Sequence, residues 1–148
     1  MAIAIKNLTR RPLAPRAAFS AIAADMLPGW DISLVFVGPA KARALNKQLR
    51  NKDYVPNVLS YALDKKSGEI IICPAEAKKQ APDFSMDERA FILYLFIHGA
   101  LHIKGWAHGA TMEKCEQKLL AKYGATNSDR HRHRHVPGKN GRRRGTLR

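Results

Sequence analysis

The chain has 148 residues, which is enough for one domain with a hydrophobic core and too few for two. Its formal net charge of +14 is large for this size and indicates a polyanionic partner rather than a small neutral substrate. The longest apolar run, residues 90–101, is shorter than the roughly 20 residues that span a bilayer, so we expect no membrane partner. Cys73 and Cys115 form no CxxC pair and no signal peptide is evident, which favours a reducing compartment.

The predicted elements can be placed from apolar periodicity and from the positions of proline and glycine. Strands are expected at residues 2–8, 31–37, 57–63 and 69–73. A turn at residues 65–68 is expected to join the last two strands as a hairpin. Helices are expected at residues 16–27, 40–50, 75–80, 89–101 and 111–122. This order predicts a mixed α/β domain over residues 1–125, with one four-stranded mixed sheet and about five helices.

Residues 126–148 have a different composition from the rest of the chain. They contain eight Lys or Arg against one acid, Asp129, so they carry +7 and residues 1–125 carry the other +7. Because large apolar residues are scarce there, we expect a disordered basic tail. Clustered arginines gain affinity for a phosphate backbone by releasing counterions, which favours binding of a polyanion. The alternative is a tail that only solubilises the protein.

The longest helix of the C-terminal half has clear predicted ends. Ser85 followed by Glu88 is typical of an N-cap and capping box opening the helix at residues 89–101. Gly105 lies where a helix end favours a left-handed residue, so the chain is expected to turn back there.

Three histidines lie on this helix and in the turn that follows it. His98 and His102 are four residues apart, so their rings lie on one helix face about one turn from each other. The turn can bring His108 in as a third ligand to one ion. Three imidazoles leave one corner of a tetrahedron open, as in catalytic zinc sites. The alternative interpretation is three solvated surface histidines with no shared ligand.

The spacing HxxxHxxGxxH is also that of the metzincin proteases. Gly99 stands where such a protease has its general-base glutamate. Peptide hydrolysis by a metal-bound water needs a carboxylate to take the proton, and this segment offers none. Protease chemistry is therefore disfavoured.

Three sequence blocks resemble one known family. Residues 98–108 (HGALHIKGWAH) are similar to the HGxLHLxGxDH signature of the bacterial endoribonuclease YbeY family, also called the rRNA maturation factor family. Residues 45–61, with LNKQLR, Asp53 and NVLSY, are similar to the family block LNxxYRxxD…TDVLSFP. Residues 68–74 (GEIIICP) are similar to GDIxIxP. The blocks occur in the family's order, and the tail lies outside the resemblance.

The resemblance implies a metal-dependent endoribonuclease that cuts single-stranded RNA in ribosomal RNA maturation and ribosome quality control. It implies that His98, His102 and His108 hold one Zn²⁺ per chain, or another divalent transition metal, and that Arg50 is the family's functional arginine. An arginine fork can hold a phosphate and offset its developing charge. The expected partners are ribosomal RNA and the small ribosomal subunit or its proteins, for a monomer in the bacterial cytoplasm.

The residues expected to contact RNA are basic and lie in both parts of the chain. They are Lys47, Lys52, Lys104, Arg142, Arg143 and Arg144.

The chain departs from the family pattern before the third histidine. Ala107 replaces the signature acid, although histidine ligands normally have a carboxylate or carbonyl partner. Glu69 or Asp53 could take that place. If no acid does, the alternative function is an RNA-binding ribosome assembly factor with weak or no turnover.

A third hypothesis, a metallohydrolase acting on peptides or small molecules, is disfavoured by the +14 charge. Without the resemblance, Arg50 could also be a solvated cation at a helix end.

Overall fold

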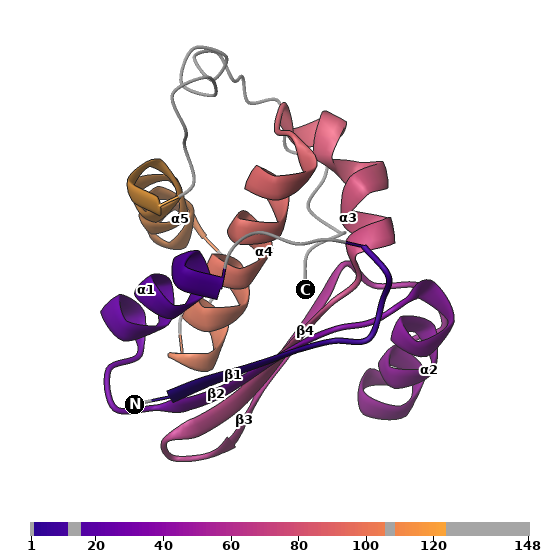
Figure 1. The fold of residues 1–148 in the computed structure, drawn as a ribbon, viewed down its shortest axis with the longest axis horizontal. Helices are drawn as coiled ribbons and strands as arrows, with labels where there is room; N and C mark the ends of the chain where they lie inside the picture. The colour runs from indigo at the N-terminus through magenta and orange to yellow at the C-terminus, as the bar shows by residue number, and fades with distance from the viewer. Residues whose placement is uncertain (1, 12–15, 106–108, 124–148) are drawn as a thin grey trace.

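The computed structural model describes residues 2–11, 16–105 and 109–123 (Figure 1). The predicted order of strands and helices is confirmed, with one added 3-10 helix, η1. The strands are β1 (Ala2–Asn7), β2 (Asp31–Phe36), β3 (Val58–Asp64) and β4 (Ser67–Ile72). The helices are α1 (Arg16–Met26), α2 (Pro39–Arg50), α3 (Pro74–Gln80), η1 (Ala81–Phe84), α4 (Glu88–Ile103) and α5 (Ala110–Tyr123).

The four strands form one mixed sheet, as the sequence predicted. Their order is β1-β2-β4-β3, in which β2 pairs in parallel with β1 and β4, and β3 pairs antiparallel with β4. Strands covered on both faces are expected to be apolar throughout, and β4 has the run Ile70 to Ile72, all buried. Leu34 lies beside Ile70 in the register and is also fully buried.

Helix α4 crosses one face of the sheet, with α1, α3 and α5 around it (Figure 1). All of its residues from Phe91 to Leu101 are buried, because the sheet and the other helices cover this part of the helix. Gly99 lets α4 approach the strands closely, since a Cβ there would lie 3.3 Å from Ile70 Cγ2 and from Ser60 Cβ. The helix with the candidate metal ligands is thus a central part of the core.

Helix α2 covers part of the opposite face of the sheet. A second, smaller apolar cluster lies there, made of Val37, Ala42, Leu59, Ile71 and Cys73. Side chains alternate between the two faces along a strand, so Ile71 joins this cluster while its neighbours Ile70 and Ile72 join the main core. The sheet therefore separates α2 from α4.

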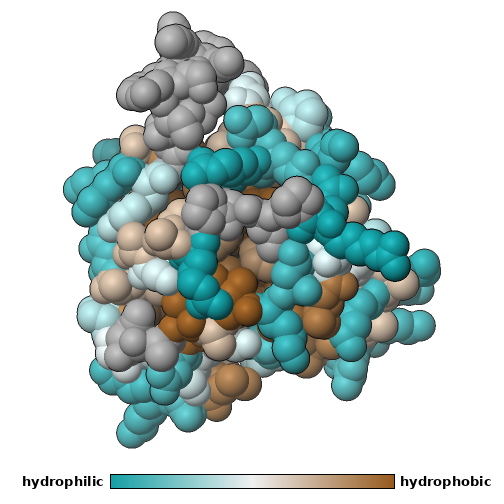
Figure 2. Space-filling model, in the orientation of Figure 1, coloured by the Kyte–Doolittle hydropathy of each residue, from teal (hydrophilic) through white to brown (hydrophobic). Residues whose placement is uncertain are grey.

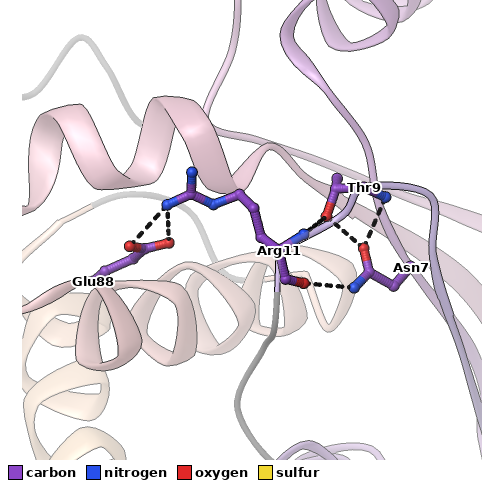
Figure 3. Close-up of polar contacts among 4 residues, drawn as sticks. All are labelled: Asn7, Thr9, Arg11 and Glu88. Carbon is purple, nitrogen blue, oxygen red and sulfur yellow. Dashed lines mark hydrogen bonds and ion pairs between the residues drawn. The ribbon is translucent and has the colours of Figure 1, made fainter.

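The segment after β1 anchors the first turn of α4 (Figure 3). Arg11 Nη2 lies 2.8 and 3.0 Å from the two carboxylate oxygens of Glu88, which is the first residue of α4. Asn7 Nδ2 donates to the Arg11 carbonyl at 2.9 Å, and Thr9 Oγ1 accepts from the Arg11 amide at 3.1 Å. This turn holds Arg11 in place, and the acid at the helix start also suits the helix dipole.

Two local predictions were wrong in detail. The N-cap of α4 is Asp87, whose carboxylate accepts from the Ala90 amide at 2.8 Å, and not Ser85. Ser85 has a left-handed backbone, with φ of 59°, because it ends η1. The hairpin turn is also shorter than expected, since β4 already begins at Ser67. The predicted left-handed Gly105 after α4 is confirmed, with φ of 103°.

The surface seen in Figure 2 is mostly hydrophilic, with apolar areas near its centre and lower edge. The exposed large apolar side chains are Leu49 on α2, Leu63 on β3, and Leu8 and Tyr54 in loops. Within the described ranges, no helix has the length and apolar character needed to cross a bilayer.

Candidate functional site

The two imidazoles on α4 lie against each other. His98 Nε2 and His102 Nε2 are 3.1 Å apart, and the ring planes meet at 83°. His98 is buried, with 2% exposure, whereas His102 is half-buried in the last turn of the helix. The pair is therefore partly exposed through His102.

A buried carboxylate contacts the far nitrogen of His98. Glu116 of α5 lies with Oε2 2.5 Å from His98 Nδ1, and its Oε1 accepts from the Tyr94 hydroxyl at 3.2 Å. A carboxylate oxygen accepts a hydrogen bond, so this contact favours a proton on Nδ1 of His98, and in a neutral ring the lone pair is then on Nε2. That lone pair lies on the side of His102.

The geometry of the histidine pair fits a tetrahedral metal ion. With metal–nitrogen bonds of about 2.0–2.1 Å, two ligand nitrogens of a tetrahedron lie about 3.3–3.4 Å apart. The observed 3.1 Å between the Nε2 atoms is close to that value. Nitrogen donors suit zinc and also copper, nickel and iron.

The third predicted ligand, His108, and the substituted position Ala107 lie outside the described residues. Within residues 2–11, 16–105 and 109–123, no group of three or more His, Cys, Asp or Glu is arranged to hold a metal ion. The structure thus brings together two of the three predicted ligands and leaves the role of His108 as a prediction.

Arg50 lies at the end of α2, on the other side of the sheet from α4. Its Nη1 donates to Asn46 Oδ1 at 2.9 Å and to the Tyr54 hydroxyl at 3.0 Å. Asn46 is buried, and its side-chain amide donates to the Tyr54 carbonyl at 3.0 Å. Arg50 is therefore held by its own helix and the following loop, and none of these contacts reaches the histidine pair.

The two acids proposed as substitutes for position 107 have other partners. Asp53 pairs with Arg43 at 2.7 Å, and this hydrogen bond, the charge of Arg43 and that of Lys47 lower the pKa of Asp53. Glu69 accepts from the Tyr61 hydroxyl on the α2 side of the sheet. Burial, followed by the hydrogen bond to Glu69, raises the pKa of Tyr61 to about 12. Glu116, and neither of these acids, contacts His98.

The basic residues predicted to contact RNA fall into three groups. Lys47 and Lys52 are exposed near Arg50, at the end of α2 and just beyond it. Lys104 is exposed at the C-terminal end of α4, two residues after His102. The three tail arginines, Arg142, Arg143 and Arg144, lie outside the described residues.

Comparison with known proteins identifies the family. The sequence profile described as Endoribonuclease YbeY matches residues 4–124. The chain belongs to the YbeY family of endoribonucleases.

Relatives of the YbeY family cover most of this chain. The Endoribonuclease YbeY of Aromatoleum aromaticum is 31% identical over 137 residues, which cover 85% of this chain and 86% of the relative. That of Neisseria meningitidis serogroup B is 35% identical over 113 residues, covering 66% of this chain and 67% of the relative. The solution structure of TM1509 from Thermotoga maritima has the same fold, with a TM-score of 0.64 at 21% identity over 93% of this chain and 99% of that one.

The sequence analysis missed one residue that contacts the histidine pair, Glu116. A signal was present, because Met112 and Glu116 are four residues apart on α5 and both are buried. An acid within the apolar stripe of a helix indicates a buried polar partner. Which partner it meets depends on how α5 packs on α4, and the sequence pattern does not contain that information.

Proposed function

We propose that this chain is a metal-dependent endoribonuclease that cuts single-stranded RNA during ribosomal RNA maturation. The observation that supports it most is the imidazole pair of a YbeY family member, with the Nε2 atoms 3.1 Å apart and one ring contacting a buried carboxylate. The net charge of +14 is suited to an RNA substrate.

In this proposal His98, His102 and His108 hold one Zn²⁺ per chain, or another divalent transition metal. When bound, such an ion supplies Lewis-acid polarisation of a phosphoryl oxygen. The half-buried position of His102 leaves one side of the pair accessible to a polynucleotide. Lys104, two residues further on, adds a positive charge for the RNA backbone beside that opening.

Arg50 has the second role, which is to bind a phosphate of the RNA. Its Nη1 is oriented by Asn46 and Tyr54, so the guanidinium is held at the end of α2. Lys47 and Lys52 nearby extend the positive charge. Since the sheet separates α2 from α4, we infer that one RNA strand passes around the molecule to reach both groups.

The cellular setting follows from this substrate. Ribosomal RNA in bacteria lies in the cytoplasm, so we propose a cytoplasmic protein that acts as a monomer on the small ribosomal subunit or its proteins. Co-sedimentation of the tagged protein with ribosomal subunits, in a cell extract, tests that partner.

The test of the activity is cleavage of a single-stranded RNA by the metal-loaded protein, with His102→Ala and Arg50→Ala as variants. Cleavage should fall strongly in both variants while the circular dichroism spectrum stays unchanged. Equal cleavage by the wild type and both variants would show that a contaminating nuclease is responsible.

A second function is favoured by Ala107, which removes the signature acid. In that case the chain is a ribosome assembly factor that binds RNA with little turnover. Salt-sensitive RNA binding without cleavage would support it, together with cleavage restored by Ala107→Asp. Deletion of residues 126–148 separately tests the tail, because loss of phosphate contacts should reduce the salt dependence of RNA binding and leave metal content unchanged.

A further inference from the structure

Glu116 is the one acidic side chain that is buried among the residues the structure describes. Only 2% of its surface is exposed, compared with the exposed Glu113 on the same helix. A buried carboxylate is costly unless hydrogen bonds compensate for lost water. Both of its oxygens have such a partner, because Oε2 contacts His98 Nδ1 at 2.5 Å and Oε1 accepts from Tyr94 at 3.2 Å.

This arrangement restricts His98 in two ways. The contact at Nδ1 selects the tautomer that has its proton on Nδ1 and its lone pair on Nε2. The hydroxyl of Tyr94, one turn before His98 on α4, fixes the second oxygen and with it the plane of the carboxylate. The imidazole ring therefore cannot rotate about χ2 without breaking the contact to Glu116.

We propose that Glu116 is a positioning residue for the metal site, which holds His98 in the tautomer and orientation that present Nε2 beside His102. The proposal rests on the proposed function, in which these two histidines are ligands. It also explains how the site can lack the signature acid at position 107, because Glu116 of α5 supplies the carboxylate partner of a proposed histidine ligand. Metal affinity is then coupled to the packing of α5 on α4.

The packing of α5 is fixed at two places. Glu116 contacts His98 within the core, and near the end of α5 Lys122 and Tyr123 contact Asp25 of α1, at 3.1 and 2.5 Å. Met112, Leu119 and Leu120 of α5 also pack in or against the main apolar core, and this packing remains when Glu116 is changed. A Glu116→Gln variant is therefore expected to stay folded, with a neutral amide of nearly the same size at this position.

The test uses the full chain and Zn²⁺, with Glu116→Gln and Glu116→Ala compared with Glu113→Gln as a matched control on the exposed side of α5. Zinc affinity is measured by chelator competition. The His98 tautomer is measured in the metal-free protein by ¹⁵N NMR, and folding by urea unfolding. Loss of a carboxylate partner typically weakens metal binding about 10–100-fold, so we expect a loss in that range for Glu116→Ala and a smaller one for Glu116→Gln. His98 should be protonated at Nδ1 in the wild type and shift towards the other tautomer in Glu116→Ala, which has no acceptor at this position, whereas the amide oxygen of Glu116→Gln can still accept from Nδ1.

The readouts separate a positioning role from a merely structural one. If Glu116→Ala is folded yet binds zinc within about threefold of the control and keeps the Nδ1–H tautomer, the proposal is overturned. If the wild type itself binds no zinc, the proposed metal site is wrong. The tautomer measurement then still decides whether Glu116 holds His98. If Glu116→Ala does not fold, Glu116→Gln gives the answer.

Discussion

The histidine pair and Arg50 lie in very different surroundings. His98 and His102 are part of α4, which is buried from Phe91 to Leu101, and His98 contacts the buried Glu116 of α5. Arg50 is the last residue of α2, which covers only part of the other face of the sheet. Its guanidinium contacts Tyr54 in the loop that follows α2. A group held in the core has a fixed geometry, whereas one at a helix end can adjust to its ligand.

The difference suggests a division of roles. In the proposed site the metal ligands should be held in place before the ion binds, and core packing supplies this for His98. An arginine can bind a phosphate in several geometries, so Arg50 does not need to be fixed in the core. Substitutions at the two places should therefore differ in what they do to folding, to metal binding and to cleavage.

The largest effect is expected for His102→Ala. RNA cleavage should fall by about 1,000-fold or more, because the proposed histidine ligands act together and the loss of one removes most of the activity. Because His102 is only half-buried, the free energy of unfolding of the metal-free protein should change little. His98→Ala should lose as much activity and also about 3 kcal/mol of stability, because the buried carboxylate of Glu116 would lose a hydrogen-bond donor. Metal analysis, RNA cleavage and urea unfolding measure this, and equal stability of the two variants would contradict it.

Arg50→Ala should lower cleavage by about 100-fold, as the loss of one charge-stabilising donor does in other enzymes. Zinc content should match the wild type, because Arg50 lies on the other side of the sheet from the histidines. The free energy of unfolding should fall by about 1 kcal/mol, because the buried Asn46 Oδ1 loses the donor Arg50 Nη1. Arg50→Lys retains the charge but not the fork, and is expected to recover only part of the activity. Loss of zinc from Arg50→Ala would show that the two places are coupled in a way this structure does not explain.

The packing of the two helices can be compared through their glycines. Gly99→Val should destabilise the protein by about 1–3 kcal/mol, because even a Cβ at this position meets Ile70 and Ser60 at 3.3 Å. Gly38, at the N-cap of α2, has nothing within 4 Å of its Cβ position, so Gly38→Ala should cost less than about 1 kcal/mol. Urea unfolding measures both. Similar losses would mean that α2 is packed as closely as α4.

The smallest effect concerns Tyr61, on the α2 side of the sheet. Its pKa is raised to about 12 by burial and by the hydrogen bond to Glu69, from 10.0 in the unfolded chain. The folded state therefore retains the phenol proton longer, and this contribution is complete below pH 10 and is lost as the pH rises towards 12. Allowing for its partial exposure, it amounts to about 1 kcal/mol. Tyr61→Phe should show a shallower loss of stability between pH 10 and 12, and parallel curves would contradict this.

The fold was predictable from the sequence because its signals are local. Apolar runs bounded by proline and glycine gave β2 and β4, and helical spacing gave α1 and α5. The cap of α4 was assigned to the wrong residue because Ser85 and Asp87 are both good N-caps. Only the backbone shows that Ser85 ends η1 instead.

The candidate site was predictable only in part. Spacing along one helix placed His98 and His102 together, because residues four apart share a helix face. Glu116 lies 18 residues after His98 and meets it only through the packing of α5 on α4. Contacts of this kind depend on tertiary structure, which periodicity does not describe.

The central claim is that the histidines hold a metal ion on which RNA cleavage depends. The most direct measurement is to remove metal from the full chain and to add Zn²⁺ back while following cleavage of a single-stranded RNA. The account predicts no cleavage without metal and a linear rise that stops at one zinc per chain, with no rise for His102→Ala. Full cleavage by the metal-free protein, or the same rise in the variant, would contradict it.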